Sequence, residues 1–325
     1  MFLMTKRKFT PIPPMAELPP AEQIDIPAVL DSYLSGTIDL ICVVGPTASG
    51  KTRYAVQLAR EINRILGTPR AEILSADSRQ VYRGMDIGTG KDLGEYEEIP
   101  YHLMDIVPAG AKYNIFEYQR DFEAAYKSIV DRGGIPILCG GSGLYIEAAT
   151  CGYSLPEVPP DPELRAELEA MEMDVLVAKL AALKPLHNTT DYDTKKRLIR
   201  ALEIAIYEAQ HPVQRSAFLP KNTYFIGTLV DRETRNAKID ARLDARIEEG
   251  MVAEVKGLLD SGISPDDLIY YGLEYKFVTQ HIVGELTLEQ MRLQLATAIH
   301  QFAKRQMTWF RGMERKGITI HWTKV

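Results

Sequence analysis

One short stretch constrains the fold of this chain more than any other. Residues 45–52 spell GPTASGKT, follow the apolar run 40–44, and precede the helix-patterned run 54–59. This order of strand, glycine-rich loop and helix is typical of a P-loop, in which backbone N–H groups, a helix N-terminus and a lysine surround phosphate. We therefore expect a ligand with at least two phosphates, with Lys51 adding positive charge and Thr52 offering its hydroxyl to Mg²⁺. The candidate phosphate-binding residues are Gly45, Pro46, Thr47, Ala48, Ser49, Gly50, Lys51 and Thr52.

Strand-like apolar runs alternate with helix-patterned segments through most of the chain. The runs fall at residues 40–44, 71–76, 101–107, 135–139 and 224–230. Such alternation predicts a parallel sheet joined by right-handed crossovers. Between residues 153 and 220 no strand is predicted, and prolines lead into short helices. We therefore predict an α/β fold with three parts: a P-loop NTPase-like parallel sheet core at 39–152 and 221–325, an inserted helical lobe at 153–220, and a loosely ordered proline-rich arm at 1–38.

The composition is that of an ordinary globular protein, because 46% of the 325 residues are hydrophobic and 25% are charged. The three cysteines, Cys42, Cys139 and Cys151, lack the paired spacing of a zinc site and fit a protein of the reducing cytoplasm. No apolar run approaches the roughly 20 residues that cross a bilayer, so we expect no membrane association. The net charge of −6 does not favour general nucleic-acid binding, although it can hide a local basic face.

Two segments could form such a face. The predicted helix 193–209 places Lys196, Arg197 and Arg200 on one side. The C-terminal segment combines lysines and arginines with the aromatic residues Phe302, Trp309, Phe310 and Trp322. Positive charge beside aromatic rings is typical of a nucleic-acid contact. A solvated helix surface explains the first segment equally well, and an ordinary C-terminal packing helix with a solvated side explains the second, so these alternatives remain open from the residues alone.

Polar residues follow two of the predicted core strands. Asp77 comes directly after the run 71–76, and Arg232 follows the run 224–230. In an open parallel sheet the carboxyl ends of the strands face the ligand crevice, so both residues are candidates for a site. The alternative for Asp77 is that it caps the turn that follows it. His102 and Asp105 are expected to be hydrogen-bonded structural groups.

Several motifs together resemble those of the tRNA dimethylallyltransferases, also called tRNA isopentenyltransferases. The P-loop GPTASGKT has the form seen in that family, and the further motifs occur in the family's order over nearly all of the chain beyond residue 38. The absence of the C-terminal zinc motif of the eukaryotic relatives favours the bacterial type. The matching segments are SADSRQVYRGMDIGTGK at 75–91, YHLMDI at 101–106, GGSGLYIEA at 140–148, KRLIRALE at 196–203, EEGMVAEV at 248–255 and FAKRQMTWFR at 302–311.

The resemblance implies a reaction. A dimethylallyl group would move from dimethylallyl diphosphate to N6 of the adenosine on the 3′ side of the anticodon in tRNA, with release of diphosphate. Asp77 matches the family's general base, and Thr47 matches the threonine that contacts the diphosphate. Mg²⁺ on Thr52, together with Lys51 and Arg232, would stabilise the charge on the leaving group. Because the N6 lone pair is delocalised into the adenine ring, a positioned base is needed, and such a base contributes roughly 10²–10⁴-fold in rate.

The resemblance also implies where tRNA binds. The target adenosine would be flipped out of the anticodon stem-loop to reach the site. With this family in view, the basic face of the helix 193–209 is expected to be functional. We further expect a cytoplasmic monomer. The positions that match tRNA-contacting residues are Asp77, Ser78, Arg79, Gln80, Ser142, Arg165, Lys196, Arg197, Leu198, Ile199 and Arg200.

The chain departs from the family pattern at a few positions. Lys238 stands where a second arginine is common, and it lacks the bidentate geometry of a guanidinium. The family's glycine–tyrosine–basic triplet is replaced by Gly272, Leu273 and Glu274. Ser142 replaces a threonine and keeps the hydroxyl. The change at Leu273 and Glu274 puts local tRNA contacts in doubt but leaves the chemical core unchanged.

Three alternatives are kept. An adenylate isopentenyltransferase, which uses free AMP, ADP or ATP, would share the P-loop and the aspartate but would not need the lobe or the basic C-terminal segment. A P-loop small-molecule kinase would transfer phosphate and usually carries an arginine-rich lid. A non-catalytic tRNA-binding relative is compatible with the departure at Leu273 and Glu274.

Overall fold

The computed structural model describes residues 18–151, 158–184, 194–211 and 220–325, and every structural statement below concerns these residues. The first 17 residues of the predicted arm, residues 153–157, 185–193 and 212–219 of the predicted lobe, and with them the first residue of the predicted helix 193–209, lie outside this range. No helix in the described part is both long enough and apolar enough to cross a membrane.

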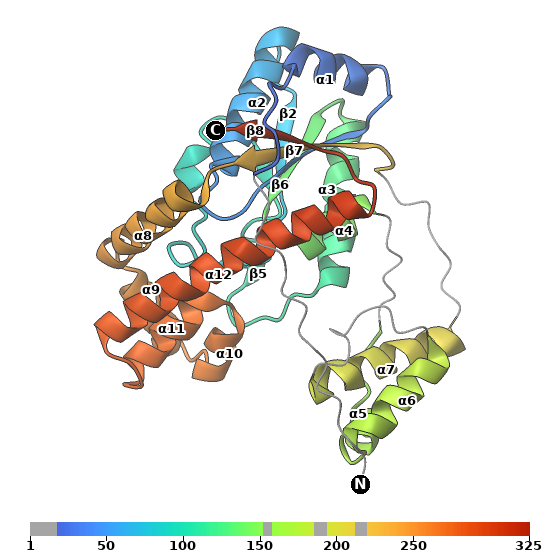
Figure 1. Ribbon diagram of the computed structural model, residues 1–325, viewed down its shortest axis with the longest axis vertical. Helices are drawn as coiled ribbons and strands as arrows, with labels where there is room; N and C mark the ends of the chain where they lie inside the picture. The colour runs from blue at the N-terminus through green and yellow to red at the C-terminus, as the bar shows by residue number, and fades with distance from the viewer. Residues whose placement is uncertain (1–17, 152–157, 185–193, 212–219) are drawn as a thin grey trace.

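The core is a six-stranded sheet in which every strand pairing is parallel (Figure 1). The parallel α/β prediction is therefore confirmed. The strand predicted at 101–107 is reduced to two short pieces, because β5 leaves the main sheet and pairs with β3. In order across the main sheet the strands are β4 (Tyr101–His102), β2 (Ala71–Ser75), β6 (Ile135–Gly140), β1 (Leu40–Val44), β7 (Thr223–Leu229) and β8 (Ile320–Lys324); the second sheet pairs β3 (Tyr82–Arg83) with β5 (Val107–Pro108).

Strand β1 shows why the sheet is covered on both faces. All five of its residues are buried. Leu40, Cys42 and Val44 belong to one hydrophobic cluster, whereas Ile41 and Val43 belong to another. Because successive side chains of a strand point to opposite faces, a continuous apolar run requires helices on both sides. The covering helices near β1 are α2 (Lys51–Leu66), α3 (Ile115–Asp131) and α4 (Gly143–Thr150).

Part of the predicted loose arm is ordered. Residues Ile26–Leu34 form helix α1, which Asp25 caps by accepting the N–H of Ala28 at 3.1 Å. Val29 and Leu30 are buried in the same cluster as the inner face of α2. The expectation of a loose arm is therefore wrong for α1, because an apolar helix face compensates for the cost of ordering this segment.

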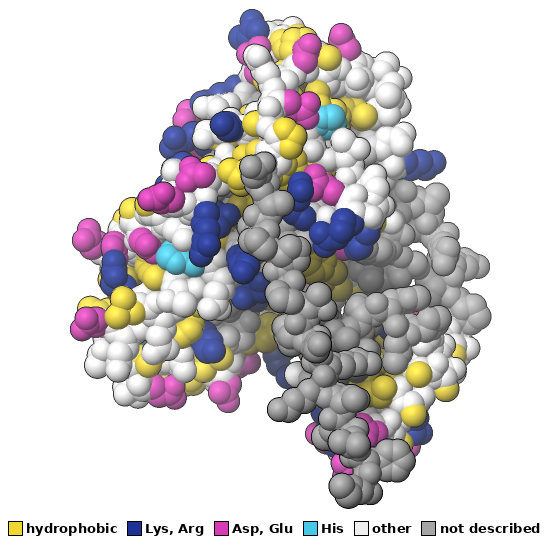
Figure 2. All heavy atoms as spheres, viewed as in Figure 1, with side chains coloured by type: hydrophobic (Ala, Val, Ile, Leu, Met, Phe, Trp, Pro, Cys, Tyr) yellow, Lys and Arg dark blue, Asp and Glu magenta, His cyan; other side chains and the backbone are white. Residues whose placement is uncertain are grey.

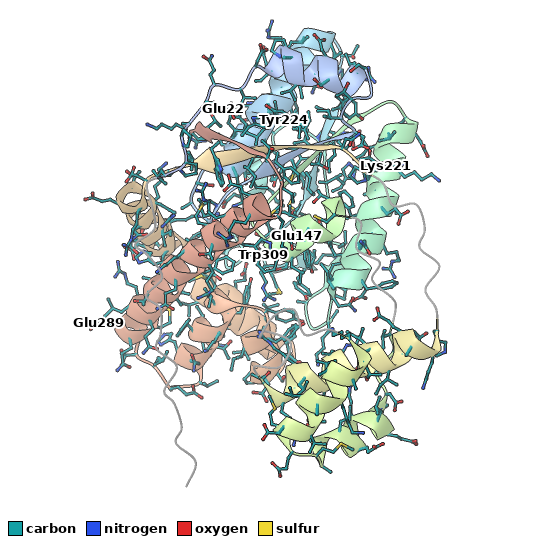
Figure 3. All side chains as sticks on the ribbon, turned by 45° about the vertical axis from the view of Figure 1, so that its right-hand side comes forward. Glu22, Glu147, Lys221, Tyr224, Glu289 and Trp309 are labelled. Carbon is teal, nitrogen blue, oxygen red and sulfur yellow. The ribbon has the colours of Figure 1, made fainter. Side chains whose placement is uncertain are left out.

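The edge strand β8 was not predicted, and its contacts explain why it forms. The ring of His321 stacks on Tyr224 with a centroid distance of 4.4 Å, and its Nδ1 lies 2.7 Å from Glu22 Oε1. Glu22 and Tyr224 lie beside each other in Figure 3. Trp322 is buried, and a Cβ atom on Gly227 would lie only 2.3 Å from its indole ring. The glycine in β7 therefore makes room for the tryptophan in β8.

Three helices form a group of their own, at the lower right of Figure 1: α5 (Pro162–Glu169), α6 (Met173–Leu183) and α7 (Lys195–Gln210). The described residues of this segment contain no strand. A separate hydrophobic cluster holds the three helices together and includes Leu168, Leu176, Leu180, Leu198 and Leu202. These helices constitute the lobe between β6 and β7.

The remainder of the chain is helical until β8. The helical stretch that begins at Arg232 is divided at Gly250, whose φ of 116° lies in the left-handed region that favours glycine. The last helix runs beneath the sheet in Figure 1. The helices of this part are α8 (Arg232–Glu249), α9 (Met251–Asp260), α10 (Pro265–Tyr270), α11 (Leu273–Ile282) and α12 (Leu288–Arg315).

Candidate active site

A cavity of about 570 Å³ lies at the carboxyl ends of the central strands. The loops that follow β1, β2 and β6 form one side of its wall, as expected for a ligand site on a parallel sheet. Helices α8, α11 and α12 contribute the other side. The size is within the range of small-molecule sites in proteins.

The P-loop contributes Thr47, Lys51 and Thr52 to this wall. Gly50 adopts a left-handed conformation with φ 79°, and α2 begins at Lys51. Burial lowers the pKa of the Lys51 ammonium, although Cys139 and Asp77 oppose this effect. A lysine in such a setting gains a strong preference for an anionic ligand.

The other residues of the loop shape it from behind the wall. The hydroxyls of Ser49 and Thr228 are hydrogen-bonded at 2.6 Å. A Cβ on Gly45 would lie 2.2 Å from Thr228 Oγ1, so only glycine fits there. Gly45, Pro46, Ala48, Ser49 and Gly50 are not part of the cavity wall, so their predicted phosphate contacts stay predictions.

Asp77 both caps a turn and lines the cavity. Its Oδ1 accepts the backbone N–H of Arg79 at 2.9 Å. The same side chain is on the cavity wall together with Lys51. The two explanations offered for Asp77 are therefore compatible, because one carboxylate oxygen holds the turn and the group still faces the ligand space.

The structure brings the predicted contacts after β2 and β6 together. Ser78, Arg79, Gln80 and Ser142 all line the same cavity as Asp77. The backbone N–H of Ser78 donates to Ser142 Oγ at 3.1 Å, and Gln80 Nε2 donates to the carbonyl of Gly90 at 3.1 Å. The first bond joins the loops after β2 and β6, which lie far apart in the sequence, and the second holds the loop after β2 against the glycine-rich loop 84–91.

The predicted contacts in the lobe are placed differently. The buried carboxylate of Glu203 pairs with Arg165 at 2.7 Å and with Arg200. The side chains of Leu198 and Ile199 are buried in the lobe's own cluster. The expectation that these two side chains face tRNA therefore needs correction, since they hold α7 in place. Lys196 and Arg197 are exposed in the first turn of the helix.

Arg232 is not brought to the cavity. It is the first residue of α8, its side chain is exposed, and it is not among the residues of the wall. Its predicted role at the diphosphate stays a prediction. Arg242 and Arg246, about three and four turns further along α8, line the cavity instead. The sequence did not reveal them, because the pattern of an amphipathic helix does not show which other parts of the fold its residues contact.

Arg242, Arg246 and Glu274 share one part of the wall. Both arginines pair with Asp92: Arg242 does so directly, and the buried Nη2 of Arg246 lies 3.8 Å from Asp92 Oδ2, which is within ion-pair range but too long for a hydrogen bond. Burial raises the pKa of the Glu274 carboxyl, and the nearby Arg246 reduces this shift. Glu274, noted in the sequence as a departure, thus lies near arginine side chains of α8 in this part of the wall.

Glu254 holds the glycine-rich loop 84–91 in place and was also missed. Its carboxylate accepts the N–H groups of Asp86, Ile87 and Gly88 at 2.8, 2.7 and 3.1 Å. The hydroxyl of Tyr275 donates to the same carboxylate at 2.6 Å. The motif EEGMVAEV that contains Glu254 was the available signal.

His102 and Asp105 are hydrogen-bonded structural groups, as expected. His102 Nε2 lies 2.6 Å from Glu72 Oε2. Asp105 pairs with the buried ammonium of Lys91, which also contacts Asp86 Oδ1 at 2.6 Å. These groups fix loops beside the site and do not line the cavity.

Helix α12 supplies an aromatic and basic part of the wall. Phe302, Arg305, Gln306 and Trp309 line the cavity, whereas Phe310 and Trp322 are buried elsewhere. Figure 2 shows Lys and Arg side chains gathered on the surface where Figure 1 places α8 and α12. The C-terminal segment thus has one set of aromatic residues in the core, as in a packing helix, and another on the cavity wall, whose contact with nucleic acid stays a prediction.

Contacts between α4 and α12 fix this wall. A Cβ atom on Gly143 would lie only 2.3 Å from the indole ring of Trp309, so glycine is needed for the two helices to pack this closely. Lys316 donates to the buried carboxylate of Glu147 at 2.7 Å. Trp309 and Glu147 lie close together near the centre of Figure 3.

The fold and the cavity define a class of protein. A P-loop at the end of a parallel strand, a carboxylate across from its lysine, and a wall of aromatic and basic side chains occur in one cavity. This is the arrangement of a P-loop α/β protein with a ligand cavity at the carboxyl ends of its strands.

Comparison with known proteins defines the family. The model of the family described as IPP transferase matches residues 80–313. "tRNA dimethylallyltransferase 1" of Porphyromonas gingivalis is 59% identical over 287 residues, which cover 87% of this chain and 93% of that protein. "tRNA dimethylallyltransferase 2" of Bacteroides fragilis is 56% identical over 288 residues, covering 87% and 92%. The chain belongs to the IPP transferase family, whose members include the tRNA dimethylallyltransferases.

Solved structures agree with this assignment. The full-length tRNA isopentenylpyrophosphate transferase of Bacillus halodurans superimposes with a TM-score of 0.62 at 33% identity, covering 88% of this chain and 89% of that chain. A eukaryotic dimethylallyltransferase acting on tRNA gives a TM-score of 0.67 at 24% identity, covering 83% and 69%, and supports the fold alone.

Proposed function

We propose that this protein transfers a dimethylallyl group from dimethylallyl diphosphate to N6 of the adenosine 3′ to the anticodon in tRNA. The observation that carries the proposal is the shared cavity of the P-loop residues Thr47, Lys51 and Thr52 with Asp77. One ligand space thereby offers a phosphate site and a base. Membership of the IPP transferase family supports the same reaction.

The chemical step follows from this placement. The N6 atom attacks the first carbon of the dimethylallyl group, the carbon–oxygen bond to the diphosphate breaks, and Asp77 accepts the proton that N6 loses. Lys51 and the N-terminus of α2 stabilise the negative charge that develops on the departing diphosphate. Thr47 lies on the wall at the same loop and would contact the diphosphate.

Mg²⁺ fits the residues present. The described residues contain no group of three or more His, Cys, Asp or Glu side chains that would hold a metal by themselves. Mg²⁺ commonly uses one or two protein oxygens together with substrate phosphates and water. Thr52, on the cavity wall beside Lys51, would supply a hydroxyl oxygen to such an ion. When bound, the ion would neutralise charge on the leaving diphosphate.

The acceptor side of the cavity suits a flipped adenosine. Phe302 and Trp309 are 38% and 40% exposed, which leaves ring surface for a base to stack on. Arg79 and Arg305 line the same cavity and would contact the RNA backbone. The lobe would extend this surface to the anticodon stem-loop through Lys196 and Arg197. We expect the protein to act in the cytoplasm as a monomer.

A transfer assay tests the proposal against the alternatives. The protein is incubated with Mg²⁺, radiolabelled dimethylallyl diphosphate, and either unmodified tRNA or AMP. Label in tRNA and not in AMP supports the proposal, whereas label in AMP alone identifies an adenylate isopentenyltransferase. No label in either acceptor would leave the kinase and the binding-only protein.

A further inference from the structure

Gln306 joins three parts of the cavity wall. It lies on α12 and is only 8% exposed. Its Oε1 accepts the backbone N–H of Thr47 at 2.8 Å, and its Nε2 donates to the carbonyl of Gly141 at 2.9 Å. One side-chain amide therefore bonds the P-loop after β1 and the glycine loop after β6. Both of its polar atoms are satisfied, as expected for a buried amide.

The junction leaves little freedom. A Cβ on Gly141 would lie 2.5 Å from Gln306 Nε2 and 3.2 Å from the carbonyl of Gly45. The glycine therefore permits the amide to sit directly against the P-loop. Because the N–H of Thr47 is used by Gln306, this peptide is oriented by α12 and not by a phosphate. The position of the Thr47 side chain thus depends on where α12 lies.

The same stretch of α12 carries the acceptor side of the cavity. Phe302, Arg305 and Trp309 lie four residues before, one before and three after Gln306, and all four line the cavity. Residues three and four apart in a helix are neighbours on one face. A ligand that contacts Phe302 and Trp309 therefore contacts the same turns of α12 that position Gln306 against the P-loop.

We propose that Gln306 is a positioning residue that couples the two substrate sites. RNA on the α12 face would restrict this helix, and Gln306 would then hold the Thr47 peptide in the arrangement that binds the donor diphosphate. The coupling is positive, since one ligand orders a group that the other also requires. Coupling between two sites typically amounts to about 5–150-fold in affinity and is the same in both directions. The inference rests on the proposed function, because it takes RNA as the ligand of the α12 face.

Binding measurements test the coupling without any transfer step. The Kd of inorganic diphosphate with Mg²⁺ is measured by calorimetry, with and without a saturating unmodified anticodon stem-loop. For the unchanged protein we expect the stem-loop to lower this Kd at least about 5-fold. Gln306→Met keeps the side-chain length and removes both hydrogen bonds, so the two Kd values should become equal. Gln301→Met is the matched control, because Gln301 is exposed on the same helix and does not line the cavity.

A second variant guards against misfolding. Gln306→Asn keeps the amide but shortens the side chain by one methylene, so it cannot reach Thr47 and Gly141 together. It should also lose the coupling, and although the lost hydrogen bonds lower the melting temperature somewhat, a parental circular dichroism spectrum shows that the variant is folded. A purely structural role would lower the melting temperature and leave the ratio of Kd values unchanged, which would overturn the inference. A ratio of one in the unchanged protein would overturn it as well.

The two proposals can fail separately. If label is transferred to tRNA while Gln306→Met keeps the parental ratio, only the coupling is wrong. If no label is transferred, the proposed function is wrong, and the ratio of Kd values still reports whether the two sites communicate.

Discussion

At the scale of single residues, Asp77 is the group on which the proposed chemistry depends. We expect Asp77→Ala to reduce transfer by at least about 10²-fold, because the carboxylate that accepts the N6 proton is then removed. Binding of tRNA should change little, because many other residues line the cavity. Single-turnover transfer and stem-loop binding measure the two effects.

Asp77→Asn is the informative control. Its amide oxygen can still accept the Arg79 N–H that now bonds to Oδ1 at 2.9 Å, so the turn is kept while the base is lost. Transfer should be as low as in Asp77→Ala. An active Asp77→Asn enzyme would show that Asp77 serves the turn and that another group takes the proton.

Glu274 gives a prediction about pH. Burial raises the pKa of this carboxyl in the folded protein, whereas in the unfolded chain it is about 4.3. Folding therefore disfavours the ionised form. The free energy of unfolding is highest while Glu274 is protonated, and it falls as the pH rises through the folded-state pKa. Glu274→Gln should raise the melting temperature at pH 8 and have little effect near pH 4.

Melting curves of parent and Glu274→Gln between pH 4 and pH 8 provide the measurement. The gap between the two melting temperatures should widen with pH. A constant gap, or a less stable variant at pH 8, would mean that Arg246 and Arg242 already stabilise the carboxylate fully.

At the scale of elements, α9 holds a loop through one carboxylate. Removing Glu254 by an alanine substitution leaves three backbone N–H groups and the Tyr275 hydroxyl without their acceptor. The N–H of Asp86 is exposed and can bond to water instead, whereas the other three donors are partly buried. Because an unsatisfied donor costs about 1 kcal/mol at the low end of the range for buried groups, we expect Glu254→Ala to lower the free energy of unfolding by about 3 kcal/mol. Tyr275→Phe, which removes one of the four bonds, should cost about 1 kcal/mol. Urea denaturation of both variants tests the difference, and equal losses would contradict the assigned role of Glu254.

The elements also show how far the sequence alone could lead. The P-loop, its strand and its helix are contiguous, so local pattern was enough to predict them, and Asp77 followed from the end of the next strand. Strand β8 was missed because it forms an edge whose Trp322 depends on the space above Gly227. Arg242 and Gln306 were missed for a related reason: each reaches the cavity through helix packing between distant segments. The pairing of Arg200 could have been predicted, because Glu203 follows it by three residues and residues at that spacing are neighbours on a helix.

At the scale of the whole molecule, the lobe should contribute charge to RNA binding unevenly. Lys196 is exposed at the start of α7, whereas Arg200 is bonded to Glu203 and to the carbonyl of Val158. We expect Lys196→Ala to reduce the salt dependence of stem-loop binding by about one unit of slope, as for one lost phosphate contact. Arg200→Ala should instead destabilise the lobe, because Glu203 loses a partner.

Titrations of stem-loop binding between about 50 and 200 mM salt measure this slope. An unchanged salt dependence for Lys196→Ala would mean that this helix face is ordinary solvated surface and does not contact RNA. A reduced slope for Arg200→Ala would show that this arginine leaves Glu203 when RNA binds.

The pairing of β1 with β7 has a consequence for how the molecule refolds. The register begins with Leu40 opposite Thr223, so the two strands meet only after the chain between them, the lobe included, has been brought round. Closing a long loop is entropically costly and slow, whereas helices that contact near neighbours form early. The P-loop is bonded to Thr228 at the end of β7 and to Gln306 on α12, so it takes its final shape late. After dilution from denaturant, the recovery of diphosphate binding should therefore lag behind the recovery of helical circular dichroism.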